Sequence, residues 1–123
     1  MKQFLLVFLG GGFGTLLRYL ISKSLNGYFQ HFFLGTFLVN IAGCLLIGLL
    51  FGLSLKDQWM TQNQTLLLAT GFCGGFTTFS AFALENHSLL RTGELFYFSF
   101  YTILSIAIGV AAVALGIWLA RLV

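Results

Sequence analysis

Residues 71–85 read Gly71-Phe72-Cys73-Gly74-Gly75-Phe76-Thr77-Thr78-Phe79-Ser80-Ala81-Phe82-Ala83-Leu84-Glu85 and lie inside a segment apolar enough to enter a bilayer. Two adjacent glycines and then two threonines interrupt the pattern of a continuous membrane helix. Irregular backbone is tolerated at membrane depth only where protein buries it or a wet cavity adjoins it. We therefore predict a membrane helix broken at Gly74 and Gly75. Broken helices of this kind present half-helix ends to ions.

The composition indicates a membrane protein. Of the 123 residues, 59% are hydrophobic and 7% are charged, whereas soluble domains carry roughly 25% charged residues. Proline is absent, so helix breaks have to come from glycine or from hydroxyl side chains. A chain of this length is too short to enclose a pathway alone. We expect one membrane domain over residues 1–123 that forms an oligomer.

Four apolar segments predict an all-α fold with four membrane helices. Their approximate ranges are 3–25, 33–54, 65–90 and 95–120. Residues 55–64 are the most polar stretch and are predicted to form an aqueous loop, with Trp59 at the headgroup level. Small residues that suit close helix packing recur in three of the predicted helices. They are Gly10, Gly11, Gly12, Gly14, Gly48, Gly52, Ser105, Gly109, Ala112 and Gly116.

The basic residues are balanced across the predicted membrane. Four spans put both chain termini on one side, and the two sides then carry Lys2, Lys56 and Arg121 against Lys23, Arg91 and an outward-reaching Arg18. The positive-inside rule gives no preferred orientation for such a chain. We therefore predict that the chain inserts both ways and pairs antiparallel with its own inverted copy.

Three polar side chains interrupt the apolar segments. Asn40 carries donors and an acceptor that lipid cannot satisfy, and it is either an interhelical hydrogen-bonding residue or a pore-facing amide that donates to an anion. Arg18 needs a partner, a wet cavity or a route to the interface. Glu85 is either an interfacial carboxylate or part of a vestibule.

Phenylalanines follow the expected break at spacings of three. Phe76, Phe79 and Phe82 are predicted to share one helix face. Such a stripe packs against lipid or core, or it turns its rings toward a narrow path, where their positive edges coordinate a small anion. A fixed cation would bind that anion too tightly to release it. Carbonyls freed by the break, at Gly74 and Thr77, would hold a small cation if two copies met there.

Several motifs together resemble the Fluc (CrcB) fluoride channels. They are Gly35-Thr36 with Asn40, the run from Gly71 to Phe82, and the glycine-rich segment that ends in Arg18-Tyr19. The resemblance covers nearly the whole chain in length, order and spacing. It implies an antiparallel, dual-topology homodimer in a bacterial plasma membrane, with two fluoride pores and a central sodium ion. The implied function is passive, selective fluoride export that lowers cytoplasmic fluoride.

The resemblance also implies a role for each matching position. Phe79 and Phe82 are the ring-edge ligands of fluoride, and Asn40 is the pore-lining amide. The other implied site residues are the polar track of Thr78, Ser80, Tyr101 and Ser105, the vestibule residues Arg18 and Glu85, and the Na⁺-binding backbone carbonyls of Gly74 and Thr77. Ala81 and Gly109 stand where a hydroxyl is expected in the family, which thins the polar track.

Two other functions compete with the channel. A small dual-topology drug–proton antiporter needs a membrane-embedded carboxylate, and the first helix has no acidic residue while Glu85 lies near a predicted boundary. An assembly or chaperone subunit would pack through its glycines and would need no broken polar helix. An enzyme is not expected, because no nucleophile–base pair or metal cluster is visible in the sequence.

Overall fold

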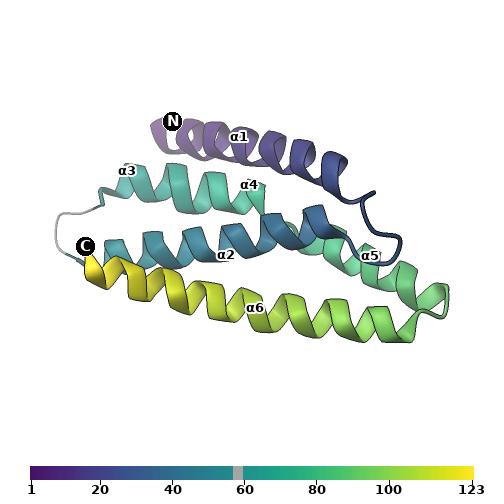
Figure 1. The fold of residues 1–123 in the computed structure, drawn as a ribbon. Helices are drawn as coiled ribbons and strands as arrows, with labels where there is room; N and C mark the ends of the chain where they lie inside the picture. The colour runs from purple at the N-terminus through teal and green to yellow at the C-terminus, as the bar shows by residue number, and fades with distance from the viewer. Residues whose placement is uncertain (57–59) are drawn as a thin grey trace.

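A computed structural model of the protein describes residues 1–56 and 60–123, and all of their regular structure is helical. Four helical segments are long and apolar enough to cross a membrane, as predicted, and the chain is a multi-pass membrane protein. Three of the four are single helices, α1 (Lys2–Leu25), α2 (Leu34–Ser54) and α6 (Leu95–Leu122). Figure 1 shows that both chain termini lie at the same end of the bundle.

The third segment is built from four pieces. They are α3 (Gln62–Thr65), η1 (Leu66–Cys73), α4 (Gly74–Phe76) and α5 (Phe79–Arg91). Thr61 caps α3, since its hydroxyl oxygen accepts the Gln64 N–H at 3.3 Å. Residues 62–64, which were predicted to lie in the loop, therefore begin the helix. The predicted headgroup anchor, Trp59, lies outside the described residues.

Glycines bring α1 against the third segment (Figure 1). A Cβ atom added to Gly14 would collide with the backbone carbonyl of Phe72 and lie 2.8 Å from the backbone nitrogen of Phe76. A Cβ atom on Gly75 would collide with the carbonyl of Gly11. The two backbones thus touch at glycines, which is the close packing that small residues allow in membranes. The predicted packing role is confirmed for Gly10 and Gly14, whereas Gly12 is exposed and meets no neighbour.

A second glycine contact joins α2 to α6. A Cβ atom on Gly48 would collide with the carbonyl of Val113, and one on Gly116 with the carbonyl of Leu45. Figure 1 shows these two helices side by side along their length. The predicted small-residue surfaces of both helices are therefore packing surfaces. Before its break the third segment packs on α1, and beyond it α5 packs on α6 and α2.

The break lies at Thr77 and Thr78 rather than at the glycine pair. Thr77 (φ −85°, ψ 157°) and Thr78 (φ −148°, ψ 116°) are both extended. The predicted break at Gly74 and Gly75 is wrong, because both glycines lie within α4. The absence of a side chain at Gly75 lets its backbone contact α1. The glycine therefore serves helix packing and not backbone bending. The Thr77 hydroxyl donates to the Cys73 carbonyl at 2.9 Å, and this bond closes the helix before the break.

Candidate functional site

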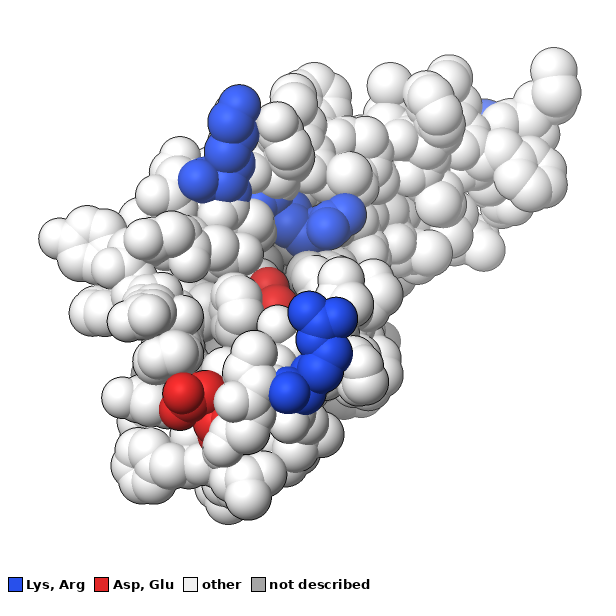
Figure 2. Space-filling model, turned by 90° about the vertical axis from the view of Figure 1, so that its right-hand side faces the viewer, with Lys and Arg blue, Asp and Glu red and all other residues white. Residues whose placement is uncertain are grey.

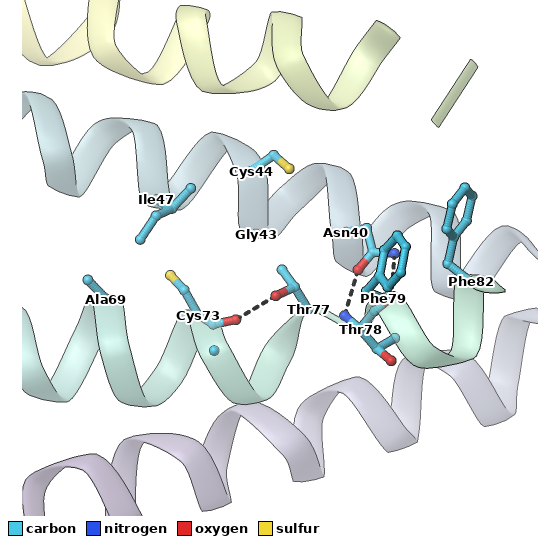
Figure 3. A pocket seen from close by; sticks show the side chains of 11 residues that line it. Asn40, Gly43, Cys44, Ile47, Ala69, Cys73, Thr77, Thr78, Phe79 and Phe82 are labelled. Carbon is cyan, nitrogen blue, oxygen red and sulfur yellow. Dashed lines mark hydrogen bonds between the residues drawn. The ribbon is translucent and has the colours of Figure 1, made fainter. Parts of the chain in front are cut away.

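Asn40 on α2 holds the backbone at the break. Its Oδ1 accepts the Thr78 N–H at 2.7 Å, and its Nδ2 donates to the Thr78 carbonyl at 3.1 Å (Figure 3). Of the two interpretations of Asn40, the interhelical hydrogen bond is therefore confirmed. The amide nitrogen carries two hydrogens, so one donor remains beyond the bond to Thr78.

The break releases carbonyl groups at the end of α4 from their helical donors, and those of Gly74 and Thr77 are two of them. In a continuous helix the N–H of residue 78 would donate to the Gly74 carbonyl, and that of residue 81 to the Thr77 carbonyl. The Thr78 N–H donates to Asn40 instead. The Ala81 N–H donates to the Thr78 hydroxyl at 3.2 Å, which caps α5. The carbonyls of Gly74 and Thr77 are thus released from helical hydrogen bonding.

Arg18 contacts the third segment next to these carbonyls. Its Nε donates to the Gly75 carbonyl at 2.9 Å, and the Thr15 hydroxyl lies 3.4 Å from the same oxygen. The guanidinium therefore lies at the C-terminal end of α4, where the helix dipole favours a positive charge. A partner, a wet cavity and a route to the interface were the three environments expected for Arg18. The structure shows a partner, the Gly75 carbonyl. Its assignment to a vestibule stays a prediction.

Two phenylalanines lie on the first turn of α5. The ring centroids of Phe79 and Phe82 are 6.0 Å apart, and the Phe82 ring lies 5.4 Å from that of Tyr101. Phe79 is 79% exposed in the single chain. The prediction that Phe76 shares their face is wrong. Phe76 precedes the break, is buried and stacks on Phe72.

A groove of about 390 Å³ joins these features between α2 and the third segment (Figure 3). Its walls bring together six of the predicted site residues, which are Asn40, Gly74, Thr77, Thr78, Phe79 and Phe82. The other lining residues are Gly43, Cys44, Ile47, Ala69 and Cys73. None of the eleven side chains carries a formal charge. The remaining predicted residues, Arg18, Ser80, Glu85, Tyr101 and Ser105, do not line this groove.

Glu85 is buried among hydrogen-bond donors. Its Oε1 accepts the Thr36 hydroxyl at 2.6 Å and the Asn26 amide at 3.5 Å, and its Oε2 accepts the Tyr101 hydroxyl at 2.8 Å. Glu85 is only 9% exposed, so it is not an exposed interfacial carboxylate. Figure 2 looks at this end of the bundle and shows acidic atoms in a recess between basic side chains. The carboxylate acts as a hydrogen-bond acceptor on both oxygens.

The predicted polar track is divided between two helices. Thr78 and Ser80 lie together near the start of α5, with their hydroxyl oxygens 3.4 Å apart. Tyr101 on α6 is fully buried and bonded to Glu85. Ser105 lies one turn beyond Tyr101, and its buried hydroxyl has no hydrogen-bond partner among the residues that the structure describes. An unpaired hydroxyl in such a place is costly unless a further ligand uses it.

Residues 5–117 match the protein family described as CrcB-like protein, Camphor Resistance (CrcB). This match spans most of the chain, including both glycine contacts and the break. The chain belongs to the CrcB-like family.

Individual relatives agree with this assignment. The CrcB-like chain is 49% identical over 122 residues to a fluoride-specific ion channel FluC of Gloeothece citriformis, with 98% of each chain covered. It is 45% identical over 117 residues to the protein of that name from Azobacteroides pseudotrichonymphae, with 94% of each chain covered. A third FluC, from Prosthecochloris aestuarii, is 49% identical over 117 residues, which are 95% of this chain and 91% of that protein.

Sequence reasoning missed several polar residues of this CrcB-like chain. Asn26 is not among the predicted site residues, yet it reaches Glu85 and accepts the Thr36 N–H at 2.9 Å. Asn86 and Thr102 were given no role, and they bond to one another at 2.7 Å. The available signal was weak, because polar residues near the end of an apolar segment are ordinarily expected to be exposed to solvent.

Asn40→Ala is expected to destabilise the protein by about 1–3 kcal/mol, because the buried N–H and C=O of Thr78 would lose their partner. The thermal unfolding midpoint of the purified protein in detergent measures this change. Asn63→Ala is the matched control, since Asn63 is exposed on α3. Equal unfolding midpoints for the two variants would show that Asn40 does not hold the break.

Proposed function

We propose that the protein is a passive, fluoride-selective ion channel that exports fluoride and lowers its cytoplasmic concentration. The observation that carries the proposal is the uncharged groove in which Phe79, Phe82 and the Asn40 amide lie together. Relatives of this chain bear the name fluoride-specific ion channel, which supports the same function. A channel and not an enzyme is the class that fits this family and this groove.

The chemistry of the groove suits a small anion that has to leave again. Aromatic ring edges carry partial positive charge, and Asn40 has a donor hydrogen beyond its bond to Thr78. These groups replace part of the hydration shell without a fixed cation. Binding is then strong enough to admit the ion and weak enough to release it. A negative-inside membrane potential drives an anion outward, at about 2.3 kcal/mol per unit charge for each 100 mV.

The groove is open on one side, and we propose that an inverted copy of the chain completes it. Phe79 is 79% exposed in the single chain, and balanced loop charges allow both orientations in the membrane. The resulting antiparallel homodimer would have two pores in the plasma membrane of a bacterium. Each pore would continue along the hydroxyls of Thr78, Ser80, Tyr101 and Ser105, with Arg18 and Glu85 in the vestibules.

The released carbonyls of Gly74 and Thr77 fit a small cation. Backbone carbonyl oxygens are established ligands of alkali metal ions in channels, and both of these have lost their helical donors at the break. A Cβ atom on Gly74 would meet nothing within 4 Å, so its backbone faces open space. We propose that these carbonyls from two copies hold a structural Na⁺, which supplies positive charge at the centre of the dimer.

Fluoride efflux from proteoliposomes tests the proposed function. The vesicles are loaded with fluoride or chloride, a potassium ionophore sets the membrane potential, and ion-selective electrodes record release. We expect rapid fluoride release and no comparable chloride release. Folded, reconstituted protein that releases neither anion would overturn the proposal. Proton-driven release of an organic cation in the same vesicles would indicate the antiporter, and the assembly subunit would move no ion.

A further inference from the structure

Helix α5 carries Phe79 and Phe82, yet it is held by unusually polar contacts. Only three of its residues are buried, Glu85, Asn86 and Leu89, and two of these three are polar. Apolar burial is therefore a small part of what fixes the helix. The position of the phenylalanines depends instead on hydrogen bonds whose geometry is directional.

Asn86 connects the Phe82 backbone to the neighbouring helix. Its Nδ2 donates to the Phe82 carbonyl at 2.9 Å, and its Oδ1 accepts the Thr102 hydroxyl at 2.7 Å. The orientation of the amide is fixed, because a carbonyl can only accept and therefore has to face the NH₂ end. Asn86 is 7% exposed, so loss of either partner would leave a buried polar group unsatisfied.

A second bond lies directly beside this one. Glu85 precedes Asn86 and accepts the Tyr101 hydroxyl, while Tyr101 precedes Thr102. A single hydrogen bond between two helices would allow rotation about it. Two adjacent bonds fix both the height and the rotation of α5 against α6. The ring of Tyr101 also lies 5.4 Å from that of Phe82, so the fixed helix face is the one that contacts the proposed path.

We propose that Asn86 and Thr102 form a positioning pair for Phe82. The pair sets the angle at which the Phe82 ring edge meets the ion, and neither residue touches the ion. This inference rests on the proposed function in one respect, that Phe82 coordinates fluoride. The pair itself lies outside the groove, since neither member lines it.

Thr102→Val tests the pair, because valine keeps the shape of threonine and removes the donor to Asn86 Oδ1. We expect fluoride efflux per folded channel to fall about tenfold, since displacement of a positioned group by a fraction of an ångström is costly. Thr102→Ser retains a hydroxyl and is expected to stay within about twofold of the parent. Efflux of Thr102→Val equal to that of the parent, in folded protein, would overturn the proposal.

Two further variants test whether the position of the Asn86 amide matters, beyond its polarity and beyond the general stability of α5. Asn86→Gln keeps the amide but moves it by one methylene, so it cannot serve Phe82 and Thr102 in the present geometry, and it should lose efflux as Thr102→Val does. Thr92→Val is the matched control, because the Thr92 hydroxyl bonds only to carbonyls of its own helix. Full efflux of Asn86→Gln would contradict a positioning role.

A spectroscopic readout keeps the inference separate from the proposed function. With 4-fluorophenylalanine at position 82, fluorine NMR should give one resonance in the parent protein and in Thr92→Val. In Thr102→Val the resonance should shift or split, because the ring is no longer held in one position. If the parent releases no fluoride, the channel proposal fails while the resonances still decide whether the pair positions Phe82. An unchanged resonance in Thr102→Val would refute the pair.

Discussion

Phe82→Ile should abolish fluoride efflux, by at least about a hundredfold, which is the scale seen when one preorganised polar contact is removed from a reacting site. Isoleucine keeps an apolar side chain beside Tyr101 but has no ring edge to present to an anion. The half-buried position of Phe82 allows the exchange without a large cavity. Efflux from proteoliposomes is the measurement, with the amount of folded protein determined by size-exclusion chromatography.

Phe13→Ile makes the same chemical change away from the groove and is the control. Phe13 is 69% exposed on α1, where its ring faces outward. Its efflux should equal that of the parent. Rapid fluoride release by folded Phe82→Ile protein would remove the ring edge of Phe82 from the mechanism and leave the Phe79 ring and the Asn40 amide as the proposed ligands in the groove.

Gly14→Ala is expected to have the largest effect on stability, about 3 kcal/mol or more. The added methyl group would collide with the Phe72 carbonyl and approach the Phe76 nitrogen, and both are backbone atoms that no rotamer change can move. Helix α1 would have to separate from η1 and α4. The expected result is loss of monodisperse protein in detergent, or a strongly lowered thermal unfolding midpoint.

Gly12→Ala provides the comparison on the same helix. A Cβ atom at Gly12 would meet nothing within 4 Å, and Gly12 is exposed. This variant should unfold like the parent or slightly later, because alanine favours a helix over glycine by about 1 kcal/mol. If the two alanine variants unfolded alike, the backbone contact between α1 and the third segment would not stabilise the protein.

The four membrane helices could be predicted from sequence because length and hydrophobicity alone decide them. The break could not be placed. A glycine pair is consistent with bending and with close packing, and Gly75 proved to serve the second because Gly11 lies opposite it. The true break at Thr77 and Thr78 depends on Asn40, which is 38 positions from Thr78 in the chain. A single sequence does not show that pairing.

The residues of the groove were predicted better than the hydrogen-bond partners of Glu85. Asn40, Phe79 and Phe82 lie in one groove, and their roles toward fluoride stay a prediction. The surroundings of Glu85 were not foreseen, because its donors come from three other helices or their ends, and hydropathy reports one segment at a time. Asn26 is the clearest case, since this residue at the end of α1 binds Glu85 on α5 and Thr36 on α2.

The ordinary backbone angles at the break have a consequence for biogenesis. Thr77 and Thr78 occupy extended conformations that any residue adopts, so nothing in their own geometry forbids a continuous helix. When residues 62–91 first leave the translocon, an unbroken helix would satisfy every internal backbone group in lipid. The break also requires Asn40, which lies earlier in the chain on α2. An unbroken helix would therefore suffice for insertion, whereas the groove forms only when α2 and the third segment meet.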